Sequence, residues 1–288
     1  MDKLIEKAQI LSEALPYIKK FYGTTMVIKY GGSAMIDAKL KETVIQDIVL
    51  MKYVGINPVV VHGGGNHISD LMKRLGKEVV FLDGLRVTDK ETMDITEMVL
   101  TGAVNKEIVS LINLEGAKAV GISGKDGMLI QASKKVQSDN KDYGFVGQIT
   151  KINPKIIEVL AQEGFIPVIS PIGFSEDGHT YNINADIVAG EIAGALNASK
   201  LILLTDVRGV CRDMKDESTL ISTLKISDLP SLKAEGIISD GMLPKMDSCI
   251  KAFETGVEKI HLIDGRIEHS ILLELFTEGG IGTEILRG

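Results

Sequence analysis

The stretch VVVHGGGNHI, residues 59–68, places three consecutive glycines between a run of valines and the start of a helical pattern. A short β-branched run of this kind is typical of a buried strand. Gly63, Gly64 and Gly65 have no Cβ, so their backbone N–H groups can come close to a ligand. Because the positive end of the following helix lies at the same turn, the stretch predicts a strand, a turn and a helix that together bind an anion.

A second turn of the same kind follows the first predicted strand. The sequence KYGGS, residues 29–33, overlaps the end of the apolar run 25–30, and Lys29 stands at its edge. Two such turns after two parallel strands lie at the carboxyl edge of the sheet, where open α/β sheets bind their ligands. With the adjacent lysine, they favour a site for a small anion or a nucleotide over a purely structural role.

Short apolar runs alternate with helical patterns over most of the chain. The runs lie near 25–30, 58–62, 117–122, 166–173, 200–207, 259–264 and 281–286, and the helical patterns near 38–54, 66–75, 90–113, 153–163, 185–196, 242–255 and 269–277. Residues 127–135 and 145–152 look instead like an antiparallel pair of strands. The alternation predicts an α/β fold, a three-layer αβα sandwich around a mainly parallel central sheet.

We expect three regions: an N-terminal helical arm over 1–24, an N-terminal lobe over 25–178 and a C-terminal lobe over 179–288, with both lobes sharing one sheet. Pro16 lies inside the arm, so it forms either two segments or one bent helix. The arm packs on its own domain or docks on another subunit, and the sequence leaves both alternatives open. Its apolar residues recur at the spacing of an amphipathic helix, at Leu4, Ala8, Leu11, Leu15, Ile18 and Tyr22.

The composition is that of an ordinary globular protein of 288 residues, 44% of them hydrophobic. The formal net charge of -7 argues against a nucleic-acid partner, because binding to a phosphate backbone relies on basic surface. Cys211 and Cys249 follow no metal-ligand spacing, so we expect neither a disulfide framework nor a structural metal site. An apolar run of about 18 residues is lacking, and we expect a cytoplasmic protein without a membrane span.

Familiar nucleotide-binding and hydrolase motifs do not fit these turns. The P-loop pattern GxxxxGK[ST] fails because Lys77 and Lys125, which follow glycines, precede acidic residues. The dinucleotide pattern GxGxxG fails because Ile68 stands at its last position. HGGGN could form the oxyanion loop of a lipase, but the matching GxSxG motif is missing. The turns therefore indicate a less common way of binding small anions or nucleotides.

Several polar residues could act on a bound anion. Asn182, Asn184 and Asp186 in YNINAD lie two positions apart where a predicted strand runs into a helix. Helix capping by Asn184 would explain one of the three, but not all of them. Arg86 in GLRVTD carries a guanidinium suited to a carboxylate. Lys245 lies near a helix N-terminus, where its charge opposes the dipole, which points to an anionic partner.

No histidine pairs with an obvious Ser or Cys nucleophile. We interpret all five as structural residues or hydrogen-bond donors: His62, His67, His179, His261 and His269. A substrate carboxylate that is already ionised at neutral pH needs no general base. Catalysis would then consist of holding two anions in line and neutralising the migrating charge with lysines and backbone N–H groups.

With these motifs the chain resembles the amino acid kinase family over nearly its whole length. The resemblance implies an open αβα sandwich whose N-terminal lobe binds an acyl amino acid and whose C-terminal lobe binds ATP with Mg²⁺. The implied reaction is phosphorylation of a side-chain carboxylate. The blocks that carry the resemblance occur in the family's order, as VIKYGGSAM, VVVHGGGNHI, FLDGLRVTD, MVLTGAVNKEIV, GISGKDG, NINADIVAGEIA, LILLTDVRGV and GIISDGMLPKM.

GLRVTD followed by NINAD is similar to the branch of the family that acts on N-acetyl-L-glutamate in arginine biosynthesis. Glutamate, aspartate, carbamate and uridylate kinases are the nearest alternatives. A non-catalytic arginine sensor is an alternative of another class. The presence of both lysines and Asp186 argues against such a sensor.

The resemblance implies roles for individual residues. Lys29 and Lys245 match the lysines that stabilise the transferring phosphoryl group, and Asp186 matches the carboxylate that positions them. The predicted substrate site comprises Gly64, Gly65, Arg86, Asn182 and Asn184. The predicted nucleotide site comprises Lys29, Gly31, Gly32, Ser33, Thr205, Asp206 and Lys245.

The arm and the segment 261–285 are similar to the arginine-inhibited, hexameric members of the family, in which the extra helix links three dimers into a ring. Glu274 is expected to pair with the guanidinium of L-arginine. An ordinary helix with an exposed glutamate is the alternative, and the resemblance leaves open whether a nitrogen-signalling regulatory protein binds the ring. The predicted inhibitor site comprises Tyr17, His261, Glu274, Gly280 and Gly282.

Overall fold

A mainly parallel sheet forms the centre of the protein in the computed structural model, which describes residues 1–136, 141–213, 215–238 and 242–287. Residues 239–241 of the block GIISDGMLPKM lie outside them. Among the described residues this sheet has eight strands, and only the pairing of β15 with β16 is antiparallel. In spatial order the strands are β14 (Thr223–Lys225), β16 (Thr283–Leu286), β15 (Lys259–Asp264), β11 (Lys200–Thr205), β1 (Thr25–Tyr30), β2 (Asn57–His62), β8 (Ile166–Ser170) and β5 (Ala119–Ser123).

Helices cover both faces of this sheet. Successive side chains of β1 point to opposite faces, so Met26 and Ile28 join one hydrophobic core and Val27 joins the other. The first core includes residues of α2 (Ala38–Tyr53), α5 (Asn105–Leu114) and α10 (Ser270–Phe276), and the second includes residues of α6 (Lys155–Gln162), α7 (Ala185–Ala195) and α9 (Leu243–Glu254). The predicted three-layer α/β fold is confirmed.

The chain between β2 and β5 is mostly helical. The predicted long helical pattern near 90–113 is one helical run with a π-helix in its middle. The elements are α3 (Gly65–Arg74), the hairpin of β3 (Phe81–Leu82) and β4 (Leu85–Arg86), α4 (Lys90–Glu97), the π-helix η2 (Met98–Val104) and α5.

A second sheet lies beside the first. The predicted antiparallel pair is present as β6 and β7. In spatial order its strands are β10 (Thr180–Asn182), β9 (Ile172–Phe174), β6 (Ile130–Lys134) and β7 (Gly147–Ile152), and short 3₁₀ turns are η1 (Gly32–Met35), η3 (Asp126–Met128) and η4 (Ile226–Asp228).

The segment between β11 and α9 is more regular than its polar sequence indicates. It contains the hairpin of β12 (Cys211–Asp213) and β13 (Asp216–Leu220), then β14 and α8 (Leu229–Ala234). Most side chains of the hairpin are exposed, so its sequence lacks the apolar alternation that marks a half-buried strand.

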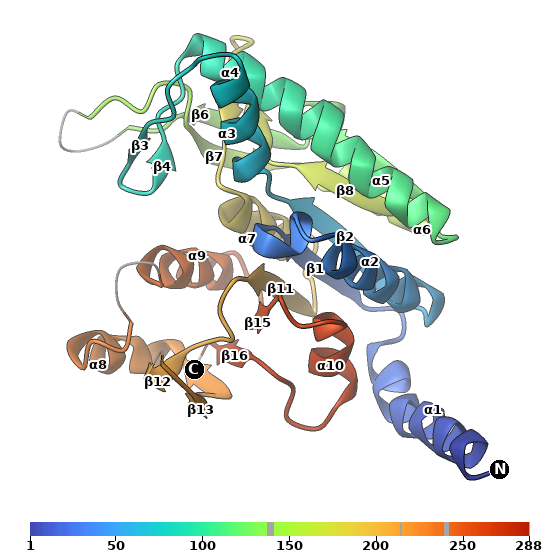
Figure 1. Ribbon diagram of the computed structural model, residues 1–288. Coiled ribbons are helices and arrows are strands. Elements are labelled where there is room, and N and C mark those ends of the chain that lie inside the picture. The colour runs from blue at the N-terminus through green and yellow to red at the C-terminus, as the bar shows by residue number, and fades with distance from the viewer. Residues whose placement is uncertain (137–140, 214, 239–241, 288) are drawn as a thin grey trace.

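The N-terminal arm is the helix α1 (Asp2–Phe21), which continues through Pro16 instead of dividing into two segments. In Figure 1 it projects from the body beside α10, with the N-terminus at its far end. Its last turn packs on α10, where the rings of Tyr17 and Phe21 meet Phe276 edge to face at 6.5 and 6.4 Å between centroids. None of the described helices, α1 included, is both long and apolar enough to cross a membrane.

Candidate active site

A cavity of about 360 Å³ lies at the carboxyl ends of β1, β2 and β11. The turns after these strands and the segment that joins β10 to α7 meet at this cavity. In open α/β sheets, ligands bind at this carboxyl edge. The structure therefore brings together most of the residues predicted from separate motifs. The predicted residues that line the cavity are Lys29, Gly31, Gly32, Gly64, Gly65, Arg86, Asn182, Asn184, Asp186 and Asp206.

Lys29 and Asp186 form an ion pair in this cavity. Lys29 Nζ on β1 lies 3.0 Å from Asp186 Oδ1 in the first turn of α7, and both side chains are nearly buried. Burial alone would raise the pKa of Asp186, but the charges of Lys29 and Lys245 hold it below its usual value. The carboxylate is therefore ionised and interacts favourably with the positive charges of both lysines.

Lys245 acts on the site from the start of α9. It does not line the cavity itself, but its charge is one of the two that stabilise ionised Asp186. Lys29 and Lys245 thus approach one carboxylate from the sheet and from a covering helix.

The glycine turns have the backbone geometry that the sequence predicts. Gly64 has φ +155° and precedes α3, whose first residue is Gly65, so the helix N-terminus faces the cavity. Gly63 N donates to Tyr30 O at 2.7 Å, which ties this turn to the turn after β1. Gly32 has φ +69°, and a Cβ there would lie 2.6 Å from Asp206 Oδ1. Both turns therefore expose bare backbone to the same space.

Arg86 is a buried cation on the wall of the cavity. Its Nη2 donates to Gly65 O and to Ser69 Oγ, both at 2.8 Å, and its guanidinium carbon lies 4.8 Å from the centre of the Phe81 ring. These contacts fix the guanidinium beside the glycine turn. Burial lowers the pKa of Arg86 from its usual value, which still leaves it charged at neutral pH.

The remaining predicted residues have mixed outcomes. Asn184 lines the cavity, yet its Oδ1 caps α7 by accepting from Asp186 N at 2.7 Å. Asn182 also lines it and donates to Thr88 Oγ1 at 3.3 Å. Ser33 does not line the cavity, but its N donates to Oδ1 of Asp206, a lining residue, at 2.7 Å. Thr205 is buried, and its hydroxyl donates to Val207 O, so it supports the turn after β11 without lining the cavity.

Several residues that line the cavity were not predicted as site residues, and Phe81 and Leu100 are two of them. Phe81, from the β3–β4 hairpin, and Leu100, from the π-helix η2, line the cavity together with the polar groups. Apolar residues carry no motif of their own, and only the packing of the hairpin and the helix brings these two to the site.

Comparison with known proteins agrees with this geometry. Residues 24–264 match the sequence profile described as the Amino acid kinase family. The chain belongs to the amino acid kinase family. The family membership predicted from sequence motifs is therefore confirmed, and the cavity at the carboxyl edge is the candidate active site of this family member.

Individual proteins are similar to this chain over nearly its whole length. An acetylglutamate kinase from Desulforamulus reducens is 58% identical over 282 residues, which are 98% of this chain and 98% of that protein. Among solved structures, N-acetylglutamate synthase from Neisseria gonorrhoeae complexed with coenzyme A and N-acetyl-glutamate is 28% identical in sequence and superposes with a TM-score of 0.86. A second structure of that synthase, complexed with coenzyme A and L-arginine, is 26% identical, with a TM-score of 0.82. The aligned region is 98% of this chain in both comparisons, but only 63% and 65% of the two synthase chains.

A second cavity, of about 470 Å³, lies between α1, α10 and the strands β11 and β15. Four of the five residues predicted for an inhibitor site line it, namely Tyr17, His261, Glu274 and Gly280. Gly282 does not line it, but its N–H donates to Glu274 Oε2 at 3.0 Å.

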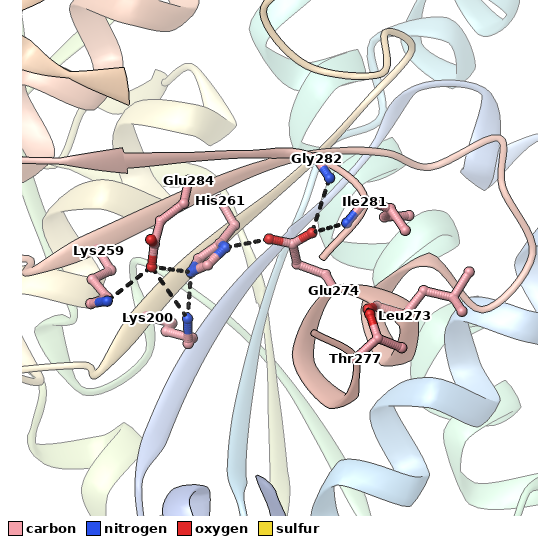
Figure 2. A network of polar contacts seen from close by, with 9 residues as sticks. All are labelled: Lys200, Lys259, His261, Leu273, Glu274, Thr277, Ile281, Gly282 and Glu284. Atoms are coloured by element: carbon pink, nitrogen blue, oxygen red, sulfur yellow. Dashed lines mark hydrogen bonds and ion pairs between the residues drawn. The ribbon is translucent and has the colours of Figure 1, made fainter. Parts of the chain in front are cut away.

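A chain of polar contacts forms one side of this second cavity (Figure 2). Lys200 Nζ lies 2.5 Å from His261 Nε2, and His261 Nδ1 lies 2.6 Å from Glu274 Oε1. Glu284 Oε1 lies 2.9 Å from Lys259 Nζ and 4.0 Å from Lys200 Nζ. Burial alone would raise the pKa of Glu274, but hydrogen bonds from His261 and backbone N–H groups hold it below its usual value. Lys200 and Glu284 were missed as site residues because only the order of the strands brings them to His261.

Proposed function

We propose that this amino acid kinase is an acetylglutamate kinase, which transfers the γ-phosphoryl group of ATP to the side-chain carboxylate of N-acetyl-L-glutamate. The observation that carries the proposal is the pairing of Lys29 with Asp186, near Lys245, in one cavity with two glycine turns. The substrate is proposed from the relatives named acetylglutamate kinase, of which one is 58% identical over nearly the full length of both chains.

The reaction needs charge stabilisation more than it needs a base. A carboxylate oxygen of N-acetyl-L-glutamate attacks the γ-phosphorus, a new O–P bond forms, and the bond from the γ-phosphorus to the bridging oxygen breaks, so that ADP leaves with the electron pair. The acceptor is ionised at neutral pH, so no proton is removed from it. Lys29 and Lys245 neutralise the charge of the migrating group, and Asp186 keeps both lysines in place.

The acceptor binds on the side of the glycine turn 63–65, in the lobe 25–178. The N–H groups of Gly64 and Gly65 face its reacting carboxylate, and Arg86 pairs with its second carboxylate. Asn182 contributes its amide, and Asn184 contributes chiefly by fixing the first turn of α7, because its oxygen already caps that helix.

The nucleotide binds toward the turn after β1 and the lobe 179–288. Gly31, Gly32 and Ser33 provide backbone N–H groups for the β- and γ-phosphates, while Asp206 holds this turn by accepting from Ser33 N. Thr205 acts behind it, through the turn after β11. Among the described side chains no group of three or more His, Cys, Asp or Glu residues could hold a metal ion, so we propose that Mg²⁺ binds chiefly to the phosphates of ATP and to water.

A coupled assay for ADP, with hydroxylamine present to trap the acyl phosphate, tests the proposal. We expect hydroxamate with N-acetyl-L-glutamate and MgATP, and little with L-glutamate, L-aspartate or carbamate. Product from L-glutamate or L-aspartate in place of N-acetyl-L-glutamate would contradict the substrate. No product from any of the four acceptors would favour an arginine sensor.

We further propose that the second cavity binds L-arginine as a feedback inhibitor. Glu274 is nearly buried and ionised, as a guanidinium partner must be, and Lys200, Lys259 and Lys20 supply positive charge for a carboxylate in the same cavity. The related synthase solved with L-arginine supports this choice of ligand.

Glu274→Gln tests the inhibitor site. The amide cannot pair with a guanidinium as a carboxylate does, so arginine should no longer inhibit, while kcat without arginine stays near that of the unaltered protein. Glu278→Gln, on the same cavity, is the matched control and should lose less inhibition. Full inhibition of the Glu274 variant would contradict the proposed site.

We also propose a cytoplasmic homohexamer, a trimer of dimers linked through α1. The apolar residues in the outer part of this helix do not pack on the chain itself: Leu4 is 64% exposed, Leu11 73% and Leu15 47%. An apolar seam of this length is typical of a helix that packs on another subunit.

A further inference from the structure

His62 is a buried histidine directly before the glycine turn 63–65. Its side chain is completely buried, and Nδ1 lies 2.7 Å from Gly63 O. A carbonyl oxygen can only accept a hydrogen bond, so Nδ1 carries the proton and donates it. In the neutral ring Nε2 must then accept.

Asn105 supplies the donor that Nε2 needs. Its Nδ2 lies 3.2 Å from His62 Nε2 and donates to Val168 O at 2.9 Å, which accounts for both of its N–H bonds. Its Oδ1 accepts from Lys106 Nζ at 3.1 Å, and Lys106 also donates to Gly121 O at 3.0 Å. Because an ammonium group can only donate, Lys106 fixes which end of the Asn105 amide faces the histidine.

The protonation state of His62 agrees with these bonds. Burial lowers the pKa of His62 to about 4. The hydrogen bond to Gly63 opposes this shift, and the charges of His67 and Lys106 add to it. His62 is therefore neutral at physiological pH, with one fixed tautomer.

The helix that carries Asn105 also touches the glycine turn directly. Asn105 begins α5 immediately after the π-helix η2, and a π-helical segment within a helix is a frequent mark of a functional site. From η2, Leu100 packs so closely that a Cβ on Gly64 would lie 2.5 Å from its Cδ2. On the other side, a Cβ on Gly121 would lie 1.8 Å from Asn105 Oδ1, so this strand admits Asn105 only because it has a glycine there.

We propose that Asn105 and His62 are positioning residues, which orient the glycine turn 63–65 for phosphoryl transfer. Neither touches the substrate: Asn105 orients His62, His62 holds the carbonyl of Gly63, and the next two amides are thereby directed at the acceptor carboxylate. The proposal rests on the proposed function, in which these amides stabilise charge that develops as the phosphoryl group moves. It assigns a task to a histidine that takes no part in proton transfer.

The test is a double-mutant cycle of Asn105→Ala and His62→Gln, with kcat and both KM values measured per folded enzyme. Loss of one oxyanion donor costs about 10²-fold in kcat, and a misdirected donor should cost at least about tenfold. KM for ATP should change less than about twofold. Because the two residues act in series, the double variant should be little worse than either single one. Asn113→Ala is the matched control: it lies on the same helix and bonds to Ala119 N, away from the turn, so its kcat should be unchanged.

Variants whose kcat stays within about twofold of the unaltered protein would overturn the proposal, and so would losses that multiply in the double variant. If Asn105→Ala does not fold, Asn105→Asp replaces it, because its carboxylate can still accept from Lys106 but cannot donate to His62; the same tenfold loss is expected. An unaltered protein without activity on N-acetyl-L-glutamate would contradict the proposed function itself, whereas an active protein with unaffected variants contradicts only the positioning roles.

Discussion

At the scale of single residues, two lysines share one carboxylate and have different surroundings. Lys29 pairs directly with Asp186, whereas Lys245 acts on it from the start of α9. Replacing either lysine by alanine should lower kcat by about 10²-fold or more, because each ammonium group offsets charge on the migrating phosphoryl group. The coupled ADP assay at saturating substrates measures this.

Lys155→Ala, on the exposed side of α6, is the control for these variants and should leave kcat unchanged. A loss below about threefold for Lys29→Ala or Lys245→Ala would show that other groups carry the charge.

Arg86 is proposed to bind the acceptor, and a conservative change can test this role separately from that of the lysines. Its guanidinium is held by Gly65 O and Ser69 and packs on Phe81, so a lysine at this position cannot reproduce the fork. Arg86→Lys should raise KM for N-acetyl-L-glutamate by about tenfold or more while KM for ATP stays within about twofold. Arg74→Lys, at the end of α3, should change neither value. An unchanged KM for the acceptor in Arg86→Lys would remove this residue from the substrate site.

The sequence predicts a site residue when that residue belongs to a local motif, but not when its contacts come from distant parts of the chain. Lys29, Gly64 and Asp186 stand in local motifs, in which a strand, a turn and a helix start follow one another, and the structure places all three at one cavity. Lys200 and Asn105 owe their contacts to strand order and to a helix that packs across the sheet. Their partners lie tens of positions away in the chain, so no local pattern could reveal them.

At the scale of elements, α10 is held by a residue of another helix. Asp47 on α2 is fully buried; His269 Nδ1 lies 2.7 Å from its Oδ1, and Leu272 N donates to its Oδ2 at 3.4 Å. Burial raises the pKa of Asp47 to about 6, although its hydrogen bonds to His269 and to backbone N–H groups oppose the shift. This carboxylate therefore ties α10, which carries Glu274, to α2.

The raised pKa of Asp47 predicts how stability depends on pH. The folded protein keeps a proton on Asp47 up to about pH 6, whereas the unfolded chain releases it near the ordinary value of 3.8. Between these values the folded state binds more protons, so the free energy of unfolding should fall as pH rises, by up to about 3 kcal/mol. Urea unfolding of the unaltered protein and of Asp47→Asn from pH 4 to 6 measures the difference.

The asparagine variant should lack this part of the slope. Glu42→Gln, an exposed change on the same helix, should keep it. Parallel curves for the unaltered protein and Asp47→Asn would contradict the prediction.

Elements differ in how well the sequence predicts them, for the same physical reason. The strands of the central sheet are buried on both faces and appear as apolar runs, and α3 and α7 begin at recognisable turns. The β12–β13 hairpin is exposed and polar, so it has no such pattern, and the π-helix within the run from α4 to α5 has the same residue types as an ordinary helix.

At the scale of the whole molecule, α1 joins the proposed inhibitor site to the proposed subunit contacts. Its outer part exposes apolar residues, and its last turn carries Tyr17 and Phe21, which line the second cavity. Deletion of residues 1–22 should dissociate the proposed hexamer and abolish the proposed arginine inhibition, while catalysis should persist because the active cavity lies at the other edge of the sheet. Light scattering and arginine titrations measure both effects.

Leu4→Glu with Leu11→Glu is a milder version of this change. It should dissociate the proposed ring but keep Tyr17 and Phe21 in the second cavity, so some of the proposed inhibition should remain. A truncated protein that is still hexameric and still inhibited would refute the role of the arm.

The seam between β1 and β11 has a mechanical consequence. These strands pair in register from Met26 with Lys200 to Lys29 with Leu203, so the halves proposed to hold acceptor and nucleotide are parts of one hydrogen-bonded sheet. Because neighbouring strands of this sheet are hydrogen-bonded to each other, we expect its two halves to move as one unit. Lys29 stands on a central strand of this sheet, whereas Lys245 stands on a helix of a covering layer. We therefore expect the ammonium group of Lys29 to keep its place relative to the sheet, whereas the place of the Lys245 ammonium group depends on how α9 packs on that sheet.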